Sequence, residues 1–410
     1  MPGSHTGAGS NRDSVRRHNL STLLGHLHLA GQLSRASLTT LMGLNRSTIA
    51  DLVAEVEDLG LVTQQPPEAG GRAVAGRPSV GVCVAERAYV LAVDVRVSGL
   101  VVARVGLGGR VLSQAGGPPA DGHDPRATVA AIARLVRRSV RDAAPSSVLV
   151  GIGVSVPGII ARDTGIVRLA PNLDWHDVAV ADLLADELDS SLRPVLGNDA
   201  DHGALAEHLR GVGRSVDDLV YISGEVGVGA GVVAGGRPIS GASGYAGEIG
   251  HVPFGEGSRP CHCGAHGCWE TEIGAATIAA AVGCPPNRLA ELGAYLDELI
   301  VAPEEFASIG RHLGRGVAGL VNLLNPRLVI MGGYLRSLYP WVERDVDAEM
   351  TARALRIPGM APRIVLPGLG DRPVLIGASE VAFGGLLADP VGHMMTAPRT
   401  AELFVAGRAV

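Results

Sequence analysis

Lysine is absent from this chain, so every fixed positive charge on a side chain is an arginine guanidinium. The 35 basic residues face 41 acidic residues, which gives a net charge of −6. Five of the arginines fall within residues 1–50, where the only acid is Asp13. The body is therefore acidic and the N-terminal segment basic, and this asymmetry favours a nucleic-acid contact at the N-terminus.

Long apolar runs are also missing. Charged residues interrupt each run before it reaches the roughly 18 residues that span a bilayer. The polar segment at the start lacks the apolar core of a signal peptide. We therefore expect no membrane span and a cytoplasmic location. Cysteine is scarce as well, with five in 410 residues, and in a reducing compartment we do not expect these thiols to form disulfides. At this length, two or three domains are expected.

The chain does contain a dense cluster of soft metal ligands. Cys261, Cys263 and Cys268 fall within eight residues, and His251 precedes them in the pattern H-x9-C-x-C-x4-C. Thiolate sulfur and imidazole nitrogen are ligands that Zn²⁺ prefers, and four of them complete a tetrahedral site with no open position for water. The pattern predicts a zinc ion that shapes the loop 251–268. The alternative is a set of buried free thiols.

The first sixty residues predict three short helices. Apolar residues recur at i, i+3, i+4 and i+7, the spacing of one helix face; they are Leu20, Leu23, Leu24 and Leu27. Ser34 can cap a second helix, Gly43 breaks it, and Asn45 can cap a third helix that continues to Leu59. A helix, a tight glycine-containing turn and another helix form a helix-turn-helix unit.

The start of the third predicted helix holds the residues expected to read DNA. In a helix-turn-helix unit the N-terminal residues of the recognition helix meet base edges in the major groove. Here they are Asn45, Arg46, Ser47 and Thr48. Predicted strands at 61–63 and 79–84 flank a Gly/Pro/Arg stretch that is typical of the wing of a winged helix. The remaining DNA-contact candidates are Arg35 and, in this wing, Arg72 and Arg77. The alternative is a three-helix module that docks proteins and leaves its arginines solvated.

From Tyr89 onward, β-rich runs alternate with helical stretches. The predicted strands lie near 90–94, 100–103, 148–154, 195–196 and 219–223. A helix is predicted from Asp124 to Val140, with Pro125 at its first position. This pattern predicts an α/β body whose strands lead into loops, and such loops usually hold ligands.

Several motifs in this body resemble the ROK family of sugar kinases and sugar-responsive repressors, within the actin-like, hexokinase-like superfamily. The most specific motif is Glu248-Ile249-Gly250-His251, followed by the cysteine cluster and Glu270. The supporting motifs are Pro171-Asn172-Leu173, Gly197-Asn198-Asp199-Ala200 and Asn325-Pro326 with Gly332-Gly333. The resemblance covers about residues 19–385. It implies an α/β fold in which a winged helix-turn-helix (16–84) precedes a two-lobed ROK domain (88–388).

The resemblance also implies a sugar site. Asn198 and Asp199 match residues that touch the sugar, and in the kinases of the family the aspartate is the general base. The other matching contacts are Glu248, His251 and Glu270, with Asn172 at the rim. Such polar groups pair with hydroxyls in a way that apolar walls cannot. The residues alone allow two other interpretations: Asn198 and Asp199 as helix caps, and Glu248 and Glu270 as solvated carboxylates.

The phosphate-binding parts of the family are altered here. Its kinases carry Asp-x-Gly-Gly-Thr after the first strand, where this chain has Arg96 and Val97 in place of the two glycines. Side chains there obstruct the approach of backbone N–H groups to phosphate. At the second phosphate loop, Glu225 would repel phosphate, and the remaining glycines, Gly227 and Gly229, also fit a tight hairpin. The sequence therefore predicts a protein that is not an enzyme.

The interpretation that follows is a DNA-binding transcription regulator, in the form of a repressor. A sugar or sugar derivative in the ROK-type cleft would change its affinity for operator DNA. We expect zinc as cofactor, a homodimer or homotetramer, and no membrane partner. Two alternatives remain: a sugar kinase that carries a DNA-binding head, and a docking module that responds to no ligand.

Overall fold

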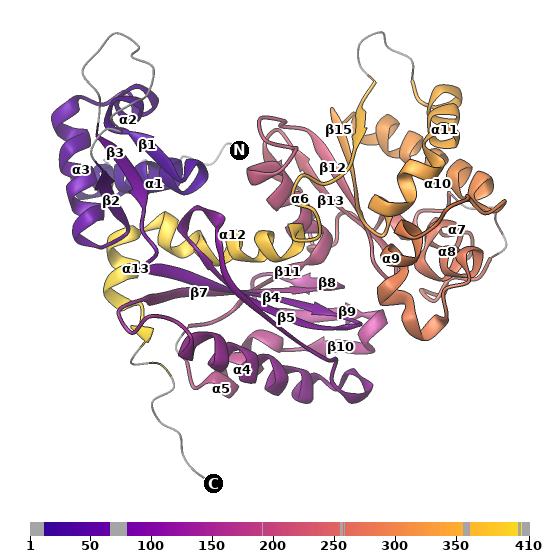
Figure 1. Cartoon of the computed structure of the whole chain (residues 1–410), viewed down its shortest axis with the longest axis horizontal. Coiled ribbons are helices and arrows are strands. Elements are labelled where there is room, and N and C mark those ends of the chain that lie inside the picture. The colour runs from indigo at the N-terminus through magenta and orange to yellow at the C-terminus, as the bar shows by residue number, and fades with distance from the viewer. Residues whose placement is uncertain are drawn as a thin grey trace, which may run out of the picture.

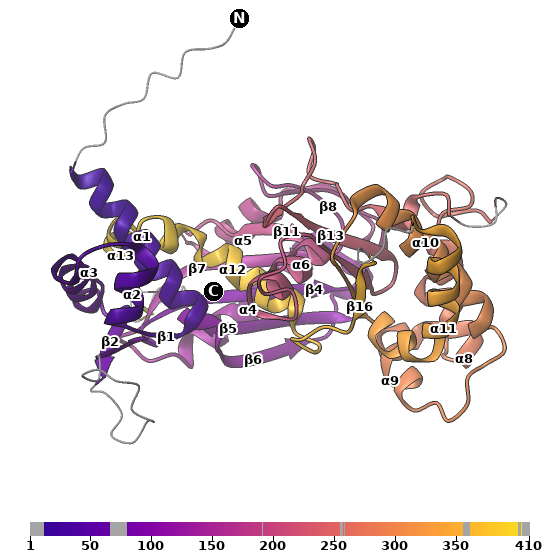
Figure 2. The same ribbon diagram turned by 90° about the horizontal axis from the view of Figure 1, so that it is seen from above.

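The computed structural model describes residues 12–65, 80–190, 192–254, 257, 259–355, 361–400 and 403. An N-terminal head of helices and a small sheet lies at one end of the molecule, and helices α8 to α11 lie at the other (Figures 1 and 2). Two larger sheets lie between these ends. The predicted phosphate contacts Arg72 and Arg77 lie outside the described residues.

The head contains the predicted helix-turn-helix. It consists of α1 (Arg12–Ala30), β1 (Gln32–Ser34), α2 (Arg35–Met42), α3 (Arg46–Asp58), β2 (Val62–Gln65) and β3 (Gly81–Val84). Its sheet is antiparallel, in the order β1-β3-β2. β1 was not predicted, because it lies between two helices and gains its partner only much later in the chain, where Leu33 pairs with Val82.

Local sequence explains where the helices of the head begin and end. The Ser34 hydroxyl accepts the Ser37 N–H, and the Asn45 carboxamide accepts the Thr48 N–H, so both predicted N-caps are confirmed. Gly43 ends α2 with φ +63°, a conformation that favours glycine. The four predicted leucines of α1 are at most 2 % exposed.

Two five-stranded sheets have the same topology. The first is β11 (Val195–Asn198), β7 (Val148–Val156), β4 (Ala88–Arg96), β5 (Gly99–Gly106) and β6 (Val111–Gly117) in spatial order; the second is β14 (Arg237–Pro238), β13 (Val228–Ala234), β12 (Leu219–Gly224), β15 (Leu328–Gly333) and β16 (Arg363–Val365). In each sheet the central strand, β4 or β12, has an antiparallel neighbour on one side and a parallel neighbour on the other. This repeat gives the two lobes expected of an actin-like fold.

Helices cover both sheets. On the first lobe these are α4 (Pro125–Arg141) and α5 (Val180–Leu188); on the second lobe they are α7 (Glu270–Ile273), α8 (Ala275–Val282), α9 (Leu292–Asp297), α10 (Phe306–Leu324) and α11 (Leu335–Arg353). A small sheet, β10-β9-β8, completes the first lobe with β8 (Ile159–Ala161), β9 (Ile166–Ala170) and β10 (Trp175–Val178). The short 3-10 helices are η1 (Leu107–Gly109), η2 (Asp121–His123), η3 (Pro171–Leu173), η4 (Ile249–His251) and η5 (Pro286–Glu291).

Two helices form a layer between the sheets. α12 (Pro373–Ala388) packs on β4 and β7, while α6 (Asp199–Arg210) packs on β12 and β13, and the two helices pack on each other (Figure 1). Glycines permit this close approach. A Cβ at Gly153 would lie 1.9 Å from the Ala378 carbonyl oxygen, and one at Gly377 would lie 1.9 Å from the His202 carbonyl oxygen.

The head shares its core with the first lobe. Leu24 and Leu27 of α1 belong to the same buried apolar cluster as Val90 of β4 and Phe383 of α12. α13 (Pro390–Thr396) follows α12 and also contacts α1. Among the described helices no single one is long and apolar enough to cross a membrane; α12 and α13 pass that test only as a pair, and they are bent by 103°.

Candidate functional site

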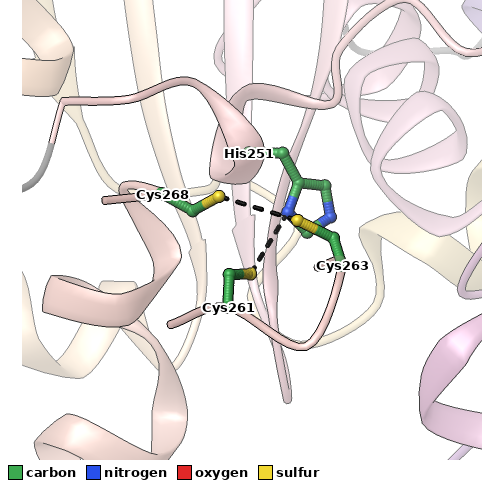
Figure 3. Close-up of side chains that lie close together, drawn as sticks. All are labelled: His251, Cys261, Cys263 and Cys268. Atoms are coloured by element: carbon green, nitrogen blue, oxygen red, sulfur yellow. Dashed lines mark hydrogen bonds between the residues drawn. The ribbon is translucent and has the colours of Figure 1, made fainter. Parts of the chain in front are cut away.

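The four predicted metal ligands converge in the second lobe. η4 positions His251, and the loop after it carries Cys261, Cys263 and Cys268 (Figure 3). The loop folds back on itself through hydrogen bonds from Cys261 N–H to Ala265 O (2.8 Å) and from Gly264 N–H to Cys261 O (3.0 Å). One ligand atom from each of the four residues lies within 4.8 Å of all the others.

The spacing of these atoms fits a tetrahedral metal ion. The distance from Cys261 Sγ to His251 Nδ1 is 3.7 Å, and that from Cys263 Sγ to Cys268 Sγ is also 3.7 Å. Ligands bound tetrahedrally to an ion at about 2.3 Å are separated by about 3.8 Å. Burial, with hydrogen bonds from the neighbouring thiols, raises the pKa of Cys268 to about 12. A bound cation favours the thiolate instead. The cluster can therefore hold a metal ion.

The first carboxylate of the candidate sugar site stands at the start of α6. Asn198 is the N-cap of this helix, because its Oδ1 accepts the N–H groups of Ala200 (2.8 Å) and Asp201 (3.2 Å). Its Nδ2 donates to Gly158 O (3.0 Å) on the opposite side. The capping interpretation of Asn198 is thus confirmed. Asp199 is the first residue of the helix, and burial followed by repulsion from Glu225 raises its pKa to about 8.

Glu270 is held in place by the second-lobe hairpin. Its Oε2 accepts the Val228 N–H (2.8 Å), and its Oε1 lies 3.3 Å from His262 Nδ1. Gly227 permits this approach, because a Cβ there would lie 2.2 Å from Oε2. The side chain of Glu270 is only 12 % exposed, so it is not a freely solvated carboxylate.

Glu248 links the carboxylates to the metal cluster. Its Oε2 lies 4.0 Å from His251 Nε2, the ring nitrogen on the opposite side from the one that faces Cys261. Burial and repulsion from Glu270 raise the pKa of Glu248. Glu248 also contributes to the raised pKa of Asp199, so it lies close enough to interact with both Asp199 and Glu270. Asn172 lies half-buried on η3, and no described polar contact joins it to these carboxylates.

Three polar residues near this cluster were not predicted. Asp201, 7 % exposed, pairs with Arg162 at 2.5 Å, and Arg162 also donates to Ser240 Oγ. His262 faces Glu270 as described above, and its ring is 5.7 Å from that of His251. A signal for His262 was available, because a residue between two metal ligands must lie beside the cluster. No local signal links Arg162 to Asp201.

The turns that correspond to the altered phosphate loops have other partners. Arg96 donates from Nε to Asp94 Oδ2 at 2.6 Å, and Asp94 is 3 % exposed. In the second lobe, β12 and β13 form a tight antiparallel hairpin, as the glycine pattern allowed. Its turn carries Glu225, which is exposed; desolvation by the protein around it and repulsion from Asp94 raise its pKa to about 7, against the opposing effect of Arg96. Asp94 and Arg96 thus stand at the first turn, and Glu225 stands at the second.

The candidate DNA-contact residues lie at the start of α3. Asn45, Arg46 and Ser47 are exposed, and Thr48 is half-buried. Asn45 Oδ1 accepts the Ser47 hydroxyl (2.7 Å) as well as the Thr48 N–H, so the cap fixes the backbone at this end. Arg35 is half-buried and donates to Gln64 Oε1 on β2. Within the described residues, this helix end combines exposed hydrogen-bonding groups with one free-standing cationic side chain, Arg46.

Comparison with known proteins identifies the fold of residues 90–384, which the ROK family model matches. The chain belongs to the ROK family. A xylose repressor of Caldicellulosiruptor bescii is 28 % identical over 87 % of this chain and 93 % of its own length. A glucokinase of Halalkalibacterium halodurans is 33 % identical over 58 % of this chain and 75 % of its own length.

Among solved structures, a ROK family transcriptional regulator described as a homologue of the E. coli Mlc protein has a similar fold. It matches 95 % of this chain and 99 % of its own length, with a TM-score of 0.73 and 23 % identity. That match includes the head, whereas the glucokinase match covers little more than half of the chain. The arrangement of head and lobes is therefore one that an existing regulator also adopts.

Proposed function

We propose that this ROK family protein is a sugar-responsive DNA-binding transcription regulator that acts as a repressor. One observation carries the proposal: a helix-turn-helix head packs on the first lobe of a body in which the carboxylates proposed to bind sugar are held in place, while Arg96 and Glu225 stand at the turns proposed to have lost phosphate. The similarity to a xylose repressor over most of both chains supports it. The two units proposed are residues 16–84 and 88–388, and the proposed location is the cytoplasm.

The proposed sugar contacts are the residues gathered around the start of α6 and the metal loop. They are Asn198, Asp199, Glu248, His251 and Glu270, with Asn172 at the rim. Asn198 has one amide hydrogen left after capping the helix and binding Gly158 O, and the carboxylates can accept hydrogen bonds from vicinal hydroxyls. Polar groups left unpaired by a wrong ligand provide the selectivity.

Zinc is the metal that we propose for the cluster of His251, Cys261, Cys263 and Cys268. Three sulfur ligands and one nitrogen ligand suit zinc, and they leave no open position. His251 would bind the ion through Nδ1 and present its other ring nitrogen to the cleft near Glu248. The ion would supply rigidity to the loop, and His251 and Glu248 would keep their orientation because of it.

The absence of kinase activity is also proposed, on the basis of the two turns. Arg96 fills the position of a glycine and is bonded to Asp94, and Glu225 adds negative charge where phosphate would lie. A triphosphate would meet the Arg96 side chain in the first lobe and the Glu225 carboxylate in the second, and the like-charge contact with Glu225 is unfavourable. One feature supports the kinase alternative: Asp199, the counterpart of the family's general base, is retained.

The proposed DNA contacts are Arg35, Asn45, Arg46, Ser47 and Thr48, with Arg72 and Arg77 outside the described residues. A homodimer or homotetramer would place two heads on successive major grooves. Sugar binding would change the position of the heads, and by linkage DNA would weaken sugar binding to the same extent.

A sugar screen with two readouts tests this function. Pentoses, hexoses and N-acetylated sugars are scored by thermal shift, since a ligand at 100-fold above its Kd adds about 2.7 kcal/mol of stability. The stabilising sugar is then titrated into a complex with an operator selected from random DNA by the protein itself. We expect release of the DNA and no turnover of ATP. Turnover of about 1–100 s⁻¹ would establish the kinase, and a DNA affinity that no sugar alters would establish the docking module.

A further inference from the structure

A buried polar cluster joins the head to the helix that begins at the cleft. We propose that His28, Arg210 and Glu380 form a junction through which occupancy of the sugar cleft controls the position of the DNA-binding head. This inference rests on the proposed function and names the residues that would transmit its signal. The three residues come from α1, α6 and α12, and their side chains are 1 %, 11 % and 3 % exposed, respectively.

α6 connects the two places directly. Its first residue is Asp199, in the cleft, and its last is Arg210, at the head. Twelve residues at about 1.5 Å each make a rod about 18 Å long. Glu207, in its last turn, accepts the backbone N–H groups of Gly368 (3.0 Å) and Leu369 (2.9 Å), just before α12. A shift at the first turn of α6 is therefore carried to its last turn and toward α12.

Arg210 contacts three different elements. Its Nε donates to Glu380 Oε1 on α12 (2.5 Å), its Nη1 donates to Gly108 O on η1 (2.8 Å), and its Nη2 donates to His28 O on α1 (3.2 Å). Gly109 allows the side chain to pass, because a Cβ there would lie 2.5 Å from Arg210 Nε. The Arg210 guanidinium thus links the end of α6 to α1 of the head, to α12 and to η1.

His28 completes the cluster with both of its ring nitrogens. The Gly108 N–H donates to His28 Nδ1 (3.2 Å), and His28 Nε2 lies 2.9 Å from Glu380 Oε2 and 2.7 Å from Arg210 Nη2. Both oxygens of Glu380 are therefore occupied. Burial raises the pKa of Glu380, but His28 and Arg210 outweigh that effect and keep it below the ordinary value.

The buried ion pair between Arg210 and Glu380 can adopt few other arrangements, as expected of an element that switches between two states. Separating a buried Arg–Glu pair leaves an uncompensated charge and is strongly unfavourable. When α6 moves, either α1 moves with it, or His28 of α1 loses its contacts with Arg210 and Glu380 together. Packed elements with two discrete arrangements carry coupling between distant sites in this way. α1 lies against α3, so its displacement reorients the helix that Asn45 caps.

The test compares two arginine variants at the boundary between head and body. Arg210→Met removes the junction. Arg87→Met is the matched control, because Arg87 also crosses this boundary, donating to Leu59 O (3.3 Å), but does not contact α6 through any described polar bond. Xylose is the probe sugar, replaced by the most stabilising sugar of the screen if xylose gives no thermal shift, and the DNA is the selected operator. Sugar binding is measured by calorimetry and DNA binding by fluorescence anisotropy, both on the full chain.

We expect xylose to weaken DNA binding at least tenfold in the wild-type protein and in Arg87→Met, but less than twofold in Arg210→Met. Arg210→Met should still bind xylose, within threefold of the wild-type Kd. An undiminished response in Arg210→Met would overturn the junction while leaving the proposed function standing. A wild-type protein that binds the operator but ignores every sugar of the screen would overturn both.

Hydrogen exchange of the wild-type protein gives a second measurement if Arg210→Met fails to fold. Xylose should change the exchange of amides in three segments: the start of α6, the end of α1 around His28, and the η1 turn around Gly108. A change confined to the start of α6 contradicts the junction. His28→Gln, which removes the acceptor for Gly108 N–H, should reduce the change at η1.

Discussion

The two lobes share one strand order, yet the turn after β4 in the first lobe and the β12–β13 turn in the second differ from the kinase pattern in different ways. In the first lobe Arg96 replaces a glycine and bonds to Asp94 at 2.6 Å. In the second lobe Gly227 is retained, and beside it stands Glu225. Packing against Glu270 explains why residue 227 is a glycine without any role in phosphate binding, because a Cβ there would lie 2.2 Å from Glu270 Oε2. A surviving glycine motif therefore need not indicate a surviving nucleotide site.

The largest expected effect comes from removing the metal cluster, which supports the sugar side in the second lobe. Cys263→Ser changes the most exposed of the three cysteine ligands, so the loss of packing is small. We expect loss of bound zinc and loss of the sugar response, because His251 and Glu248 lose their fixed orientation. Zinc content, measured with a chelating dye after denaturation, and calorimetry with the effector sugar provide the readouts.

Cys83→Ser is the control for this experiment, since Cys83 is a free cysteine of β3 in the head. It should retain zinc and respond normally to the sugar. A Cys263→Ser protein that binds sugar with wild-type affinity would show that the cluster does not support the cleft.

Substitution of the two hairpin glycines separates their roles. In Gly227→Ala the new methyl group must displace Glu270 from the Val228 N–H, so we expect sugar affinity to fall at least tenfold, about 1.4 kcal/mol. Gly229→Ala is the matched control, because a Cβ there meets only the Ala200 methyl at 3.7 Å, and its affinity should stay within twofold. Equal losses in both variants would contradict the assignment of Gly227 to the sugar side.

Local signals predicted much of this molecule. The caps Ser34 and Asn45 and the metal spacing could be read from neighbouring residues, because each involves groups close in the chain. Long-range pairings gave no such signal. β1 needs β3 as its partner, Arg162 needs Asp201, and the His28–Arg210–Glu380 cluster joins three helices that are far apart in sequence. Burial makes these pairs specific, and burial is known only once the chain is folded.

A change on the phosphate side of the second lobe should have a smaller effect and the opposite sign. Glu225→Thr removes a carboxylate from the retained hairpin and leaves the sugar contacts in place. We expect affinity for a magnesium–ATP analogue to rise by about tenfold, since one like-charge contact of about 1.4 kcal/mol is removed. Analogue binding is measured by calorimetry with the effector sugar present. Arg96→Gly in the same background should raise this affinity further, because it removes the side chain that stands where the phosphate turn of the kinases has a glycine and keeps Asp94, the aspartate of that turn. No further gain would show that Arg96 is not an obstacle.

The smallest expected effect is on stability and follows from the pKa of Asp199, which burial and Glu225 raise to about 8. The folded protein holds this proton more tightly than the unfolded chain does. The stability that the proton contributes is therefore complete below about pH 4 and is lost as the pH rises to 8. Asp199→Asn has no such proton, so its Tm does not fall for this reason. The difference in Tm between Asp199→Asn and the wild-type protein should therefore increase by about 2 °C per pH unit across this range, and partial solvent access keeps the increase small.

Thermal unfolding of both proteins from pH 5 to pH 8.5 measures this difference. Glu225→Gln serves as the comparison, because the pKa of Glu225 is raised only to about 7. The difference in Tm between Glu225→Gln and the wild-type protein should therefore stop increasing about one pH unit earlier. Glu225→Gln also removes one source of the Asp199 shift. In that background the gain from Asp199→Asn should therefore be smaller than in the wild-type protein. Parallel Tm curves for the wild-type protein and Asp199→Asn would mean that Asp199 is ionised in the cleft at every pH tested, and the cleft would then be far better hydrated than the packing around α6 implies.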